Sequence, residues 1–414
     1  MANTNDLEKK KRETRMKIQR RWVFWSLIFF ISLVLLAIAA GYIGSNFVGI
    51  GPVPTRSAFA RRLPGIPEGD RTRFNFFYAT NRENSEDTFN ARGNHLGKDL
   101  LTGTFDVLIS PYLQIAPFIW FDTPSMEWAG RQELPQTDFK LKLKQAVKAS
   151  PHQSLLIIIW GFRDWFQSAA LKTAYTSYVL DINTPVLLFD WPGNQGEGRQ
   201  GYTAAQHVSA QSAPQLGRLI ADVVRETGAE NVWVMGSSLG CQTISDSLAW
   251  LSNQPDLFHG KPKLSNVIFS APDVSADTFD EKFAERIQKL SQHFTTYVSS
   301  NDRALLMSHW INGDRRLGRT AQITVPPEER AGENEFEEAM ELLDLKAKGA
   351  RNFTIIDATP VNRTRNLHHF FTDSPEFFDD LYQHLLQPDN VVSRRLHSVR
   401  TGPQGEEYWI LWKY

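Results

Sequence analysis

The stretch VWVMGSSLGCQTI (residues 232–244) joins an apolar strand to the start of a helix through two serines bounded by glycines. Gly236 and Gly240 fit a tight strand-to-helix turn, because glycine tolerates positive φ and a close backbone approach. The same residues match the Gly-x-Ser-x-Gly turn that exposes a nucleophilic serine above a parallel sheet. A structural turn and a nucleophile elbow at Ser238 therefore both fit this stretch. The second reading requires a base, an acid and an oxyanion site elsewhere in the chain.

Short apolar strands alternate with helical segments on both sides of this turn. The predicted strands are residues 74–80, 103–110, 154–160, 185–191, 231–236, 266–272, 294–300 and 352–358. The predicted helices are residues 165–180, 204–226, 242–251, 277–290, 333–348 and 375–386. The alternation predicts an α/β fold with a doubly wound, mainly parallel sheet. Its first two strands can be antiparallel at one edge, and residues 407–414 fit either a last strand or a cover for the sheet.

Chemically useful side chains follow the strands, at the sheet edge where ligands gather in such folds. Ser238 follows one strand, and Asp302 lies just past the second strand after it. His368 and His369 come after the next strand. This order of Ser, Asp and His is that of the α/β-hydrolase fold and differs from the chymotrypsin and subtilisin orders. No Gly-x-Gly-x-x-Gly follows a first βαβ strand, so we expect no dinucleotide site.

The base and the acid each have two candidates. A serine hydroxyl needs a base, and histidine suits this role because its pKa is close to working pH. Either His368 or His369 fits, with packing on the following phenylalanines as the structural alternative. A carboxylate must hold the imidazole in one tautomer, and Asp302 or Asp273 can do so.

The oxyanion site is expected to use two backbone N–H groups. One belongs to Leu239, directly after the candidate nucleophile, and the other to Phe162, after the strand at residues 154–160. Asp190 is expected to buttress the turn before Trp191. Residues 111–128 are rich in aromatic side chains, which fit an acyl pocket, a membrane-facing side or a core excursion.

The amino end differs from the rest of the chain. Residues 9–21 are strongly basic, and residues 22–43 carry no charge and are long enough to cross a bilayer as one helix. The basic residues predict a cytoplasmic amino end, with the bulk of the protein in the periplasm or an equivalent outer compartment. Small residues at 37–41 fit a cleaved signal peptide instead. The length of the apolar run favours an uncleaved, single-pass anchor in the cell inner membrane.

The predicted organisation follows from these segments. It comprises a basic cytoplasmic segment (1–21), a transmembrane anchor (22–43), a linker (44–72), an α/β-hydrolase domain (73–390) and a C-terminal extension (391–414). The net charge of −1 gives no indication of nucleic-acid binding. The single cysteine, Cys241, excludes an intrachain disulfide and a multi-cysteine metal site. We expect no cofactor and no metal.

Residues 74–386 together resemble the α/β-hydrolases, and within them a bacterial family of unknown function (domain of unknown function 900) described as esterase/lipase superfamily enzymes. The resemblance rests on FFYATNRE, LLIIIWGF, FDWPGNQG, VMGSSLG, SAPDVSADTF, YVSSNDRAL with RRLG, and LHHFFTDSPEFFDDL, in that order. The family's His-x-Tyr-Phe pattern is similar to residues 368–371, which implies His368 as the base. Its Ser-x-x-Asp-x-Ala-Leu pattern falls on residues 299–305, which implies Asp302 as the acid.

Two positions depart from the family. It usually has His-Gly where this chain has Trp160-Gly161, and histidine where this chain has Ser237. The resemblance implies hydrolysis of an ester-like bond and names no substrate. Together with the predicted anchor and triad, it gives our leading hypothesis, a membrane-anchored serine hydrolase acting on a small-molecule or lipid-like ester. An amidase or peptidase would use the same residues. The two departures, which border the expected oxyanion region, motivate a third hypothesis, a catalytically weak interaction module at the membrane.

Overall fold

The computed structural model describes residues 25, 29–32, 61–84, 92–111, 113, 115, 125–257, 264–319, 353–363, 367–388, 396–401 and 406–411. The chain divides into two units, Met1–Gly51 and Pro52–Tyr414. In the first unit, residues 29–32 are helical and exposed. The predicted anchor at 22–43 lies mostly outside the described residues. Within the part of the chain that the structure describes, every helix is too short or too polar to span a bilayer.

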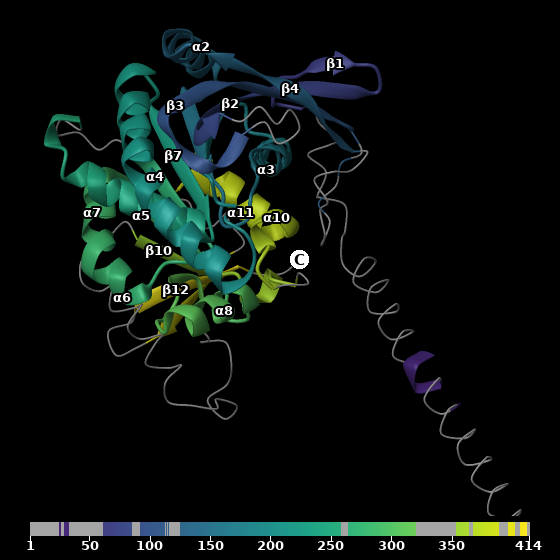
Figure 1. The fold of residues 1–414 in the computed structure, drawn as a ribbon, viewed down its shortest axis with the longest axis vertical. Coiled ribbons are helices and arrows are strands. Elements are labelled where there is room, and N and C mark those ends of the chain that lie inside the picture. Colours follow the sequence, from purple (N-terminus) through teal and green to yellow (C-terminus); the bar gives the residue numbers. More distant parts are fainter. Residues whose placement is uncertain are drawn as a thin grey trace, which may run out of the picture. The chain divides into compact units, whose positions relative to one another are not determined.

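The described residues of the second unit form one twelve-stranded sheet (Figure 1). Its strands are β1 (Ile66–Glu68), β2 (Arg71–Asn84), β3 (Arg92–Ile109), β4 (Met126–Leu134), β5 (Ser154–Ile159), β6 (Val186–Asp190), β7 (Asn231–Ser237), β8 (Leu264–Ser270), β9 (Ser291–Val298), β10 (Phe353–Asp357), β11 (Leu396–Thr401) and β12 (Glu406–Leu411). Their order is β11-β12-β10-β9-β8-β7-β5-β6-β2-β3-β4, with β1 paired to β2.

The central strands run parallel because helical crossovers join them, and these helices cover both faces of the sheet, which suits strands that are apolar on both faces. Neighbours from β2 through β6, β5, β7, β8, β9 and β10 to β12 pair in parallel. Antiparallel pairs lie at the edges, β1–β2, β2–β3 and β3–β4 on one side and β11–β12 on the other. Of the two alternatives left open for residues 407–414, the structure shows a strand: β12 extends the sheet beyond β10.

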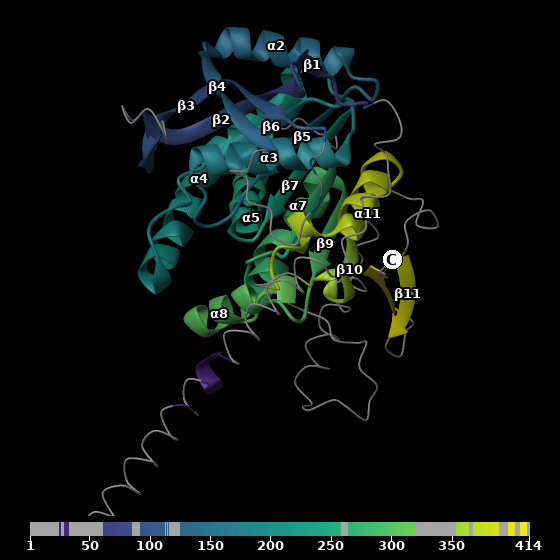
Figure 2. The same cartoon turned by 90° about the vertical axis from the view of Figure 1, so that its right-hand side faces the viewer.

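Helices cover the two faces of this sheet. They are α2 (Gln136–Ala149), α3 (Phe166–Leu180), α4 (Gly198–Glu226), α5 (Leu239–Ser252), α6 (Ala276–Thr278), α7 (Ala284–Leu290), α8 (Arg303–Asn312), α10 (Phe370–Asp373) and α11 (Pro375–Leu386). Buried residues of α2, α4, α5 and α7 pack with one face, and those of α3 and α11 pack with the other (Figure 1). Figure 2 is viewed from the side on which α3 and α11 lie in Figure 1.

Strand β5 shows how the sequence produces the two layers. Leu155, Ile157 and Ile159 belong to the core under α4 and α5, whereas Leu156 and Ile158 belong to the core under α3 and α11. Because successive side chains of a strand point to opposite faces, an unbroken apolar run such as this needs cover on both sides.

The connection around β5 creates the edge at which ligands bind in such sheets. The chain steps from β5 through α3 to its neighbour β6, and then returns through α4 to β7 on the other side of β5. The direction of winding therefore reverses between β5 and β7, and a crevice is expected outside their carboxyl ends. The turn that follows β7 is the Gly-Ser-Ser-Leu-Gly stretch.

Several boundaries differ from the predictions. Strand β1 and the start of β2 lie in the predicted linker, and β11 and β12 of the predicted extension belong to the sheet. The helix predicted at 277–290 is divided into α6, a π-helical turn (Phe279–Phe283) and α7. Helices α2 and α8 and strand β4 were not predicted. The helix predicted at 333–348 lies outside the described residues, as does most of the aromatic segment at 111–128.

Candidate active site

Ser238 forms the turn between β7 and α5 in a conformation that non-glycine residues rarely adopt. Its φ is 51° and its ψ is −128°. Such backbone geometry costs on the order of 1–3 kcal/mol and persists when the surroundings hold it. Here the Ser238 N–H donates to the Ser270 carbonyl at 3.0 Å, and the Ser238 carbonyl accepts from the Cys241 N–H at 3.0 Å. The half-buried serine is thus held on a strained turn at the edge where β7 ends.

The two glycines of the turn are required by close packing. A Cβ atom on Gly236 would lie 2.5 Å from Ile244 Cδ1, and one on Gly240 would lie 2.5 Å from the Ile159 carbonyl oxygen. The second contact joins the start of α5 to the end of β5. Both the structural turn and the elbow geometry that the sequence allowed are therefore present together.

Asp302 lies in the loop after β9 and is fully buried. One carboxylate oxygen, Oδ1, accepts from the Leu305 N–H at 2.9 Å and so caps the amino end of α8. The other, Oδ2, lies 2.6 Å from His368 Nδ1. The helix cap fixes the carboxylate, and the fixed carboxylate then selects one orientation of the imidazole.

His368 lies in the loop between β10 and α10 and is buried, with 7% of its surface exposed. Since an ionised carboxylate can only accept, Nδ1 carries the proton and Nε2 is left as an acceptor. Burial lowers the pKa of His368, and the charge and hydrogen bond of Asp302 outweigh it, so the pKa lies above the ordinary 6.5. Among the hydrogen bonds of the described residues, none joins His368 to the Ser238 hydroxyl.

His369 has different surroundings. Its ring packs edge-on against those of His368 and Phe371, with centroids 5.3 Å and 5.8 Å away. Burial, followed by the nearby charges of His368 and Lys172, lowers its pKa to about 3. His369 is therefore neutral at ordinary pH and lies beside the histidine that contacts Asp302.

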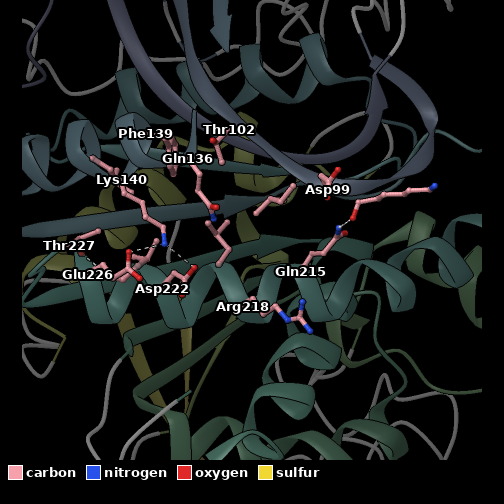
Figure 3. A pocket seen from close by; sticks show the side chains of 15 residues that line it. Asp99, Thr102, Gln136, Phe139, Lys140, Gln215, Arg218, Asp222, Glu226 and Thr227 are labelled. Atoms are coloured by element: carbon pink, nitrogen blue, oxygen red, sulfur yellow. Dashed lines mark hydrogen bonds and ion pairs between the residues drawn. The ribbon is translucent and has the colours of Figure 1, made fainter. Parts of the chain in front are cut away.

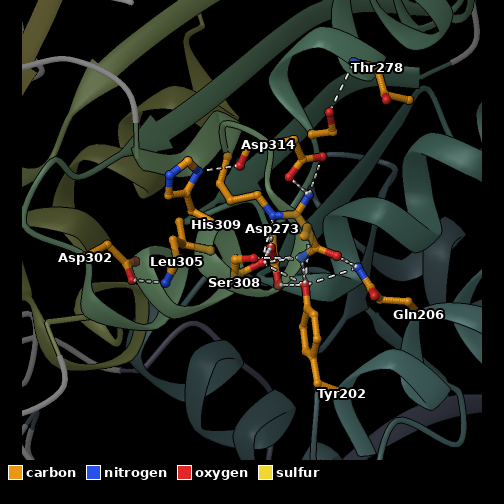
Figure 4. A network of polar contacts seen from close by, with 12 residues as sticks. Tyr202, Gln206, Asp273, Thr278, Asp302, Leu305, Ser308, His309 and Asp314 are labelled. Atoms are coloured by element: carbon orange, nitrogen blue, oxygen red, sulfur yellow. Dashed lines mark hydrogen bonds and ion pairs between the residues drawn. The ribbon is translucent and has the colours of Figure 1, made fainter. Parts of the chain in front are cut away.

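Asp273, the alternative acid, is bound into another network (Figure 4). Its carboxylate accepts from Tyr202 OH at 2.8 Å and Ser308 Oγ at 2.6 Å, and forms an ion pair with Arg316 Nε at 2.8 Å. Its backbone N–H donates to the Ser238 carbonyl at 3.1 Å. The structure thus brings Asp302 to the histidine and Asp273 to an arginine beneath the serine turn.

The expected oxyanion donors follow two neighbouring parallel strands, β5 and β7. A Cβ atom on Gly161 would lie 2.9 Å from Ser238 Cβ and 3.2 Å from the Leu239 nitrogen. The Phe162 ring packs edge-on against Tyr202 at 5.6 Å. Among the backbone hydrogen bonds of the described residues outside the helices and strands, neither the Phe162 nor the Leu239 N–H donates. Neither amide is therefore held by a backbone carbonyl of these loops and turns.

Trp160, which stands where the family usually has histidine, is a core residue. Its indole N–H donates to Thr173 Oγ1 of α3 at 2.8 Å, and its carbonyl accepts from Trp191 Nε1 at 2.8 Å. Its side chain packs in the layer under α3, on the face of the sheet away from α5. Ser237 is buried at the end of β7 and pairs with Ser270. Trp160 therefore has a structural role in the core of the α3 face.

Arg82 was not identified from the sequence. It is fully buried, and its guanidinium forms an ion pair with Asp190 at 2.7 Å. This contact gives Asp190 a structural role, as the sequence predicts. It also donates to the carbonyls of Asp164 and Trp191, each at 2.7 Å. It thus ties the ends of β2 and β6 to the loop that carries Phe162. The predicted strand at 74–80 ends before Arg82, whereas β2 continues to Asn84. The polar residues that follow Ala79 give no sign that this arginine would be buried, which requires partners.

A cavity of about 250 Å³ lies elsewhere, between α2, α4 and β3 (Figure 3). Lys140 extends across it to Asp222 at 3.4 Å and Glu226 at 2.8 Å. None of the candidate catalytic residues lines it. Among the described residues no group of three or more His, Cys, Asp or Glu side chains is placed to hold a metal ion.

Comparisons with known proteins bear on the family. The family model described as "Alpha/beta hydrolase of unknown function (DUF900)" matches residues 135–384, more than half of the chain. No curated protein matches. Among solved structures, a lipase-esterase related protein from Clostridium acetobutylicum ATCC 824 is similar at 10% identity, over 59% of this chain and 95% of that chain, with a TM-score of 0.28. Esterase B from Lactobacillus rhamnosis, with a tributyrin phosphonate, is similar at 14% identity over 47% and 75%, with a TM-score of 0.21. At these TM-scores neither likeness adds to the family match.

Proposed function

Because the chain belongs to the family of alpha/beta hydrolases of unknown function (DUF900), we propose that it is a serine hydrolase that cleaves an acyl bond, first of all a carboxylic ester. The observation that carries the proposal is the 2.6 Å contact of buried His368 with buried Asp302, at the same sheet edge as a serine on a strained turn. Esters are favoured over amides because an alcohol leaves more readily than an amine. The substrate class is a small-molecule or lipid-like ester.

In the proposed acylation step, Ser238 Oγ attacks the acyl carbon while His368 Nε2 takes its proton. The carbonyl oxygen becomes an oxyanion that accepts from the N–H groups of Leu239 and Phe162. His368 then gives the proton to the leaving alkoxide as the bond to it breaks. The alcohol departs, and the acyl group remains as an ester on Ser238.

Deacylation repeats these steps with water. His368 takes a proton from the water molecule, whose oxygen attacks the acyl carbon, and then returns it to Ser238 Oγ as the acid product leaves. Asp302 stays ionised throughout and stabilises the imidazolium that forms twice in the cycle. The proposal requires that a hydrogen bond between His368 and Ser238 forms when the substrate binds. Catalytic hydrogen bonds are often long or poorly aligned in structures without a substrate.

The test is covalent labelling of the full-length chain with a fluorophosphonate, which reacts with activated serines. We expect the label on Ser238, and we expect Ser238→Ala to abolish both labelling and hydrolysis of p-nitrophenyl butyrate. Ser237→Ala is the matched control and should still be labelled. Cys241 is an unsuitable nucleophile, because burial raises the pKa of its thiol well above the usual value.

The remaining hypotheses predict other results. A catalytically weak interaction module, motivated by Trp160 and Ser237, would leave Ser238 unlabelled in a folded wild-type chain. An amidase or peptidase would also be labelled at Ser238, and it would cleave the matching anilides in addition to the esters, whereas an esterase would leave the anilides intact. The proposal also includes an inner-membrane anchor at residues 22–43 and a hydrolase domain outside the cytoplasm, as the charge and length of the amino end predict.

A further inference from the structure

The acid and the base of the proposed triad come from separate segments. Asp302 follows β9, and His368 follows β10 and the 3-10 turn Thr359–Val361. Misplacement of a catalytic group by about 1 Å can cost on the order of 10²-fold in rate. The contact between the two residues therefore requires something that holds one loop against the other.

Asn362 lies between these two loops and is buried, with 2% of its surface exposed. On the acid side, its amide nitrogen Nδ2 lies 2.8 Å from Ser299 Oγ and 3.0 Å from Asn301 Oδ1. On the base side, the same nitrogen donates to the carbonyl of Leu367 at 2.7 Å. Asn301 donates back to the Asn362 carbonyl at 3.2 Å. One side-chain amide thus joins residues that adjoin Asp302 and His368.

The orientation of this amide follows from its neighbours. The Leu367 carbonyl can only accept, so the atom that faces it must be the nitrogen. Ser299 Oγ donates to Asn301 Oδ1 at 2.6 Å, so both oxygens are acceptors that the second N–H of Asn362 can share. The other amide atom, Oδ1, is buried and has no hydrogen-bond partner among the described residues. Asn362 is therefore placed to donate to both loops, at the cost of an unsatisfied acceptor.

The bond to Leu367 acts on a strained residue. Leu367 has a φ of +45°, in the left-handed region that residues other than glycine, asparagine and aspartate seldom adopt. It immediately precedes His368, so its conformation sets the direction in which the imidazole leaves the backbone. An asparagine that binds the carbonyl of this residue holds the strained conformation in place.

We infer that Asn362 is a positioning residue, which holds the backbone before His368 against the loop of Asp302 and so keeps the imidazole on its carboxylate. This inference rests on the proposed serine hydrolase function and names a residue that it requires. Asn362 acts through His368 and need not contact the substrate.

The experiment compares Asn362→Ala with Asn266→Ala in the full-length chain. Asn266 is also a buried asparagine, in β8, whose amide contacts His384 Nε2 at 2.7 Å and whose Oδ1 has no partner among the described residues. It lies toward the amino end of its strand, away from the serine turn. Both substitutions should lower the thermal unfolding temperature. Asn362→Ala alone should also lower kcat for p-nitrophenyl butyrate by on the order of 10²-fold, with KM little changed.

A second measurement needs no substrate. The proton between His368 Nδ1 and Asp302 should give a downfield proton NMR signal, assigned by its loss in His368→Ala. We expect this signal in the wild type and in Asn266→Ala, and its loss in Asn362→Ala. Asn362→Leu keeps the branched side-chain shape but has no hydrogen-bond donor, so it should lose the signal as Asn362→Ala does. It replaces the alanine variant in both measurements if that variant does not fold.

The two proposals fail in different ways. A folded wild type that neither hydrolyses the ester nor reacts with the fluorophosphonate would contradict the serine hydrolase function. An active wild type whose Asn362 variants keep both kcat and the downfield signal would contradict the positioning role alone. Equal loss of kcat in Asn266→Ala would also overturn it, because the effect would then be one of stability.

Discussion

Two buried carboxylates near the serine turn have different partners, and this difference predicts different effects of substitution. Asp302 binds His368, so Asp302→Asn should present an amide to Nδ1 and favour the wrong imidazole tautomer. We expect kcat for p-nitrophenyl butyrate to fall by about 10⁴-fold, the size of effect known for triad carboxylates in other hydrolases. The unfolding midpoint in urea should show that the variant is folded.

Asp273→Asn is the matched control. It leaves buried Arg316 without its full charge partner, so the free energy of unfolding should fall by about 3–5 kcal/mol. The loss of kcat should be far smaller than for Asp302→Asn. The reverse ranking of kcat would make Asp273 the acid and would require the structure to rearrange around Arg316.

The pH dependence of kcat/KM follows from the surroundings of His368. Burial lowers its pKa, while Asp302 and Asp273 raise it and Lys172 of α3 lowers it, with a net rise above 6.5. Because the base must be unprotonated, activity should rise with pH through a midpoint above about 6.5. The same shift makes the protonated histidine stabilising below its unfolded pKa, and this stabilisation is lost as pH rises through the folded pKa.

His369→Ala provides the control for this pH profile. The pKa of His369 is lowered to about 3, so it carries no charge near the midpoint and its removal should leave the midpoint in place. Asp302→Asn should move the midpoint of the residual activity to lower pH. A midpoint that follows His369 instead would show that the neighbouring histidine is the base.

At the residue scale, side chains directly after strands were predictable and those that join loops were not. Ser238, Asp302 and His368 follow strands in a fixed order, and the structure brings the last two together. Arg82 and Asn362 act through partners remote in the sequence, with Arg82 and Asp190 separated by 108 positions. Such pairings depend on the order of the strands in the sheet, and the sequence pattern of a single segment does not predict that order.

At the scale of elements, strands buried on both faces were predicted best. Residues 154–160 were predicted and β5 is Ser154–Ile159, because an apolar run between polar turns has few other placements. Strand β4 (Met126–Leu134) lies at an edge and only its two end residues are buried, so it lacks that pattern. Helix α2 did carry a signal, since Phe139, Leu143 and Val147 recur every four residues and are buried.

The loop between β5 and α3 allows a test of the predicted oxyanion site. Gly161→Ala would place a methyl group 2.9 Å from Ser238 Cβ and 3.2 Å from the Leu239 nitrogen, so the loop and the elbow must separate. Separation would move the Phe162 and Leu239 amides apart. We expect kcat for p-nitrophenyl butyrate to fall by about 10²–10³-fold, as when one oxyanion donor is removed.

Gly217→Ala is the matched control for this loop. Its added methyl group would lie 2.7 Å from Trp250 Cε3, where α4 packs on α5. It should change the thermal unfolding temperature and leave kcat at the wild-type value. Wild-type kcat in Gly161→Ala would show that the amide after β5 is not an oxyanion donor.

At the scale of the whole molecule, the sheet order explains how distant segments form one site. The turn after β7 faces the loop after β5 because β5 and β7 are neighbours, although α3, β6 and α4 separate them in the chain. The family resemblance inferred from ordered short motifs is confirmed by the family match over residues 135–384. The pairing of β11 with β12 and of β12 with β10 could not be predicted, because their register depends on a sheet already formed.

The membrane topology is the remaining prediction, and it depends on charge and length at the amino end. Eight Lys and Arg residues precede Trp22, against three acidic residues. The apolar run at 22–43 would be about 33 Å long as a helix, enough to cross a bilayer core. Positive charge holds such an end in the cytoplasm, so Ser238 should lie on the opposite side.

A phosphatase active only outside the cytoplasm, fused after Tyr414, should therefore be active, and the product should sediment with membranes and keep Met1. An inactive but stable fusion would reverse the orientation, and a mature protein beginning near Ala40 would identify the segment as a cleaved signal peptide.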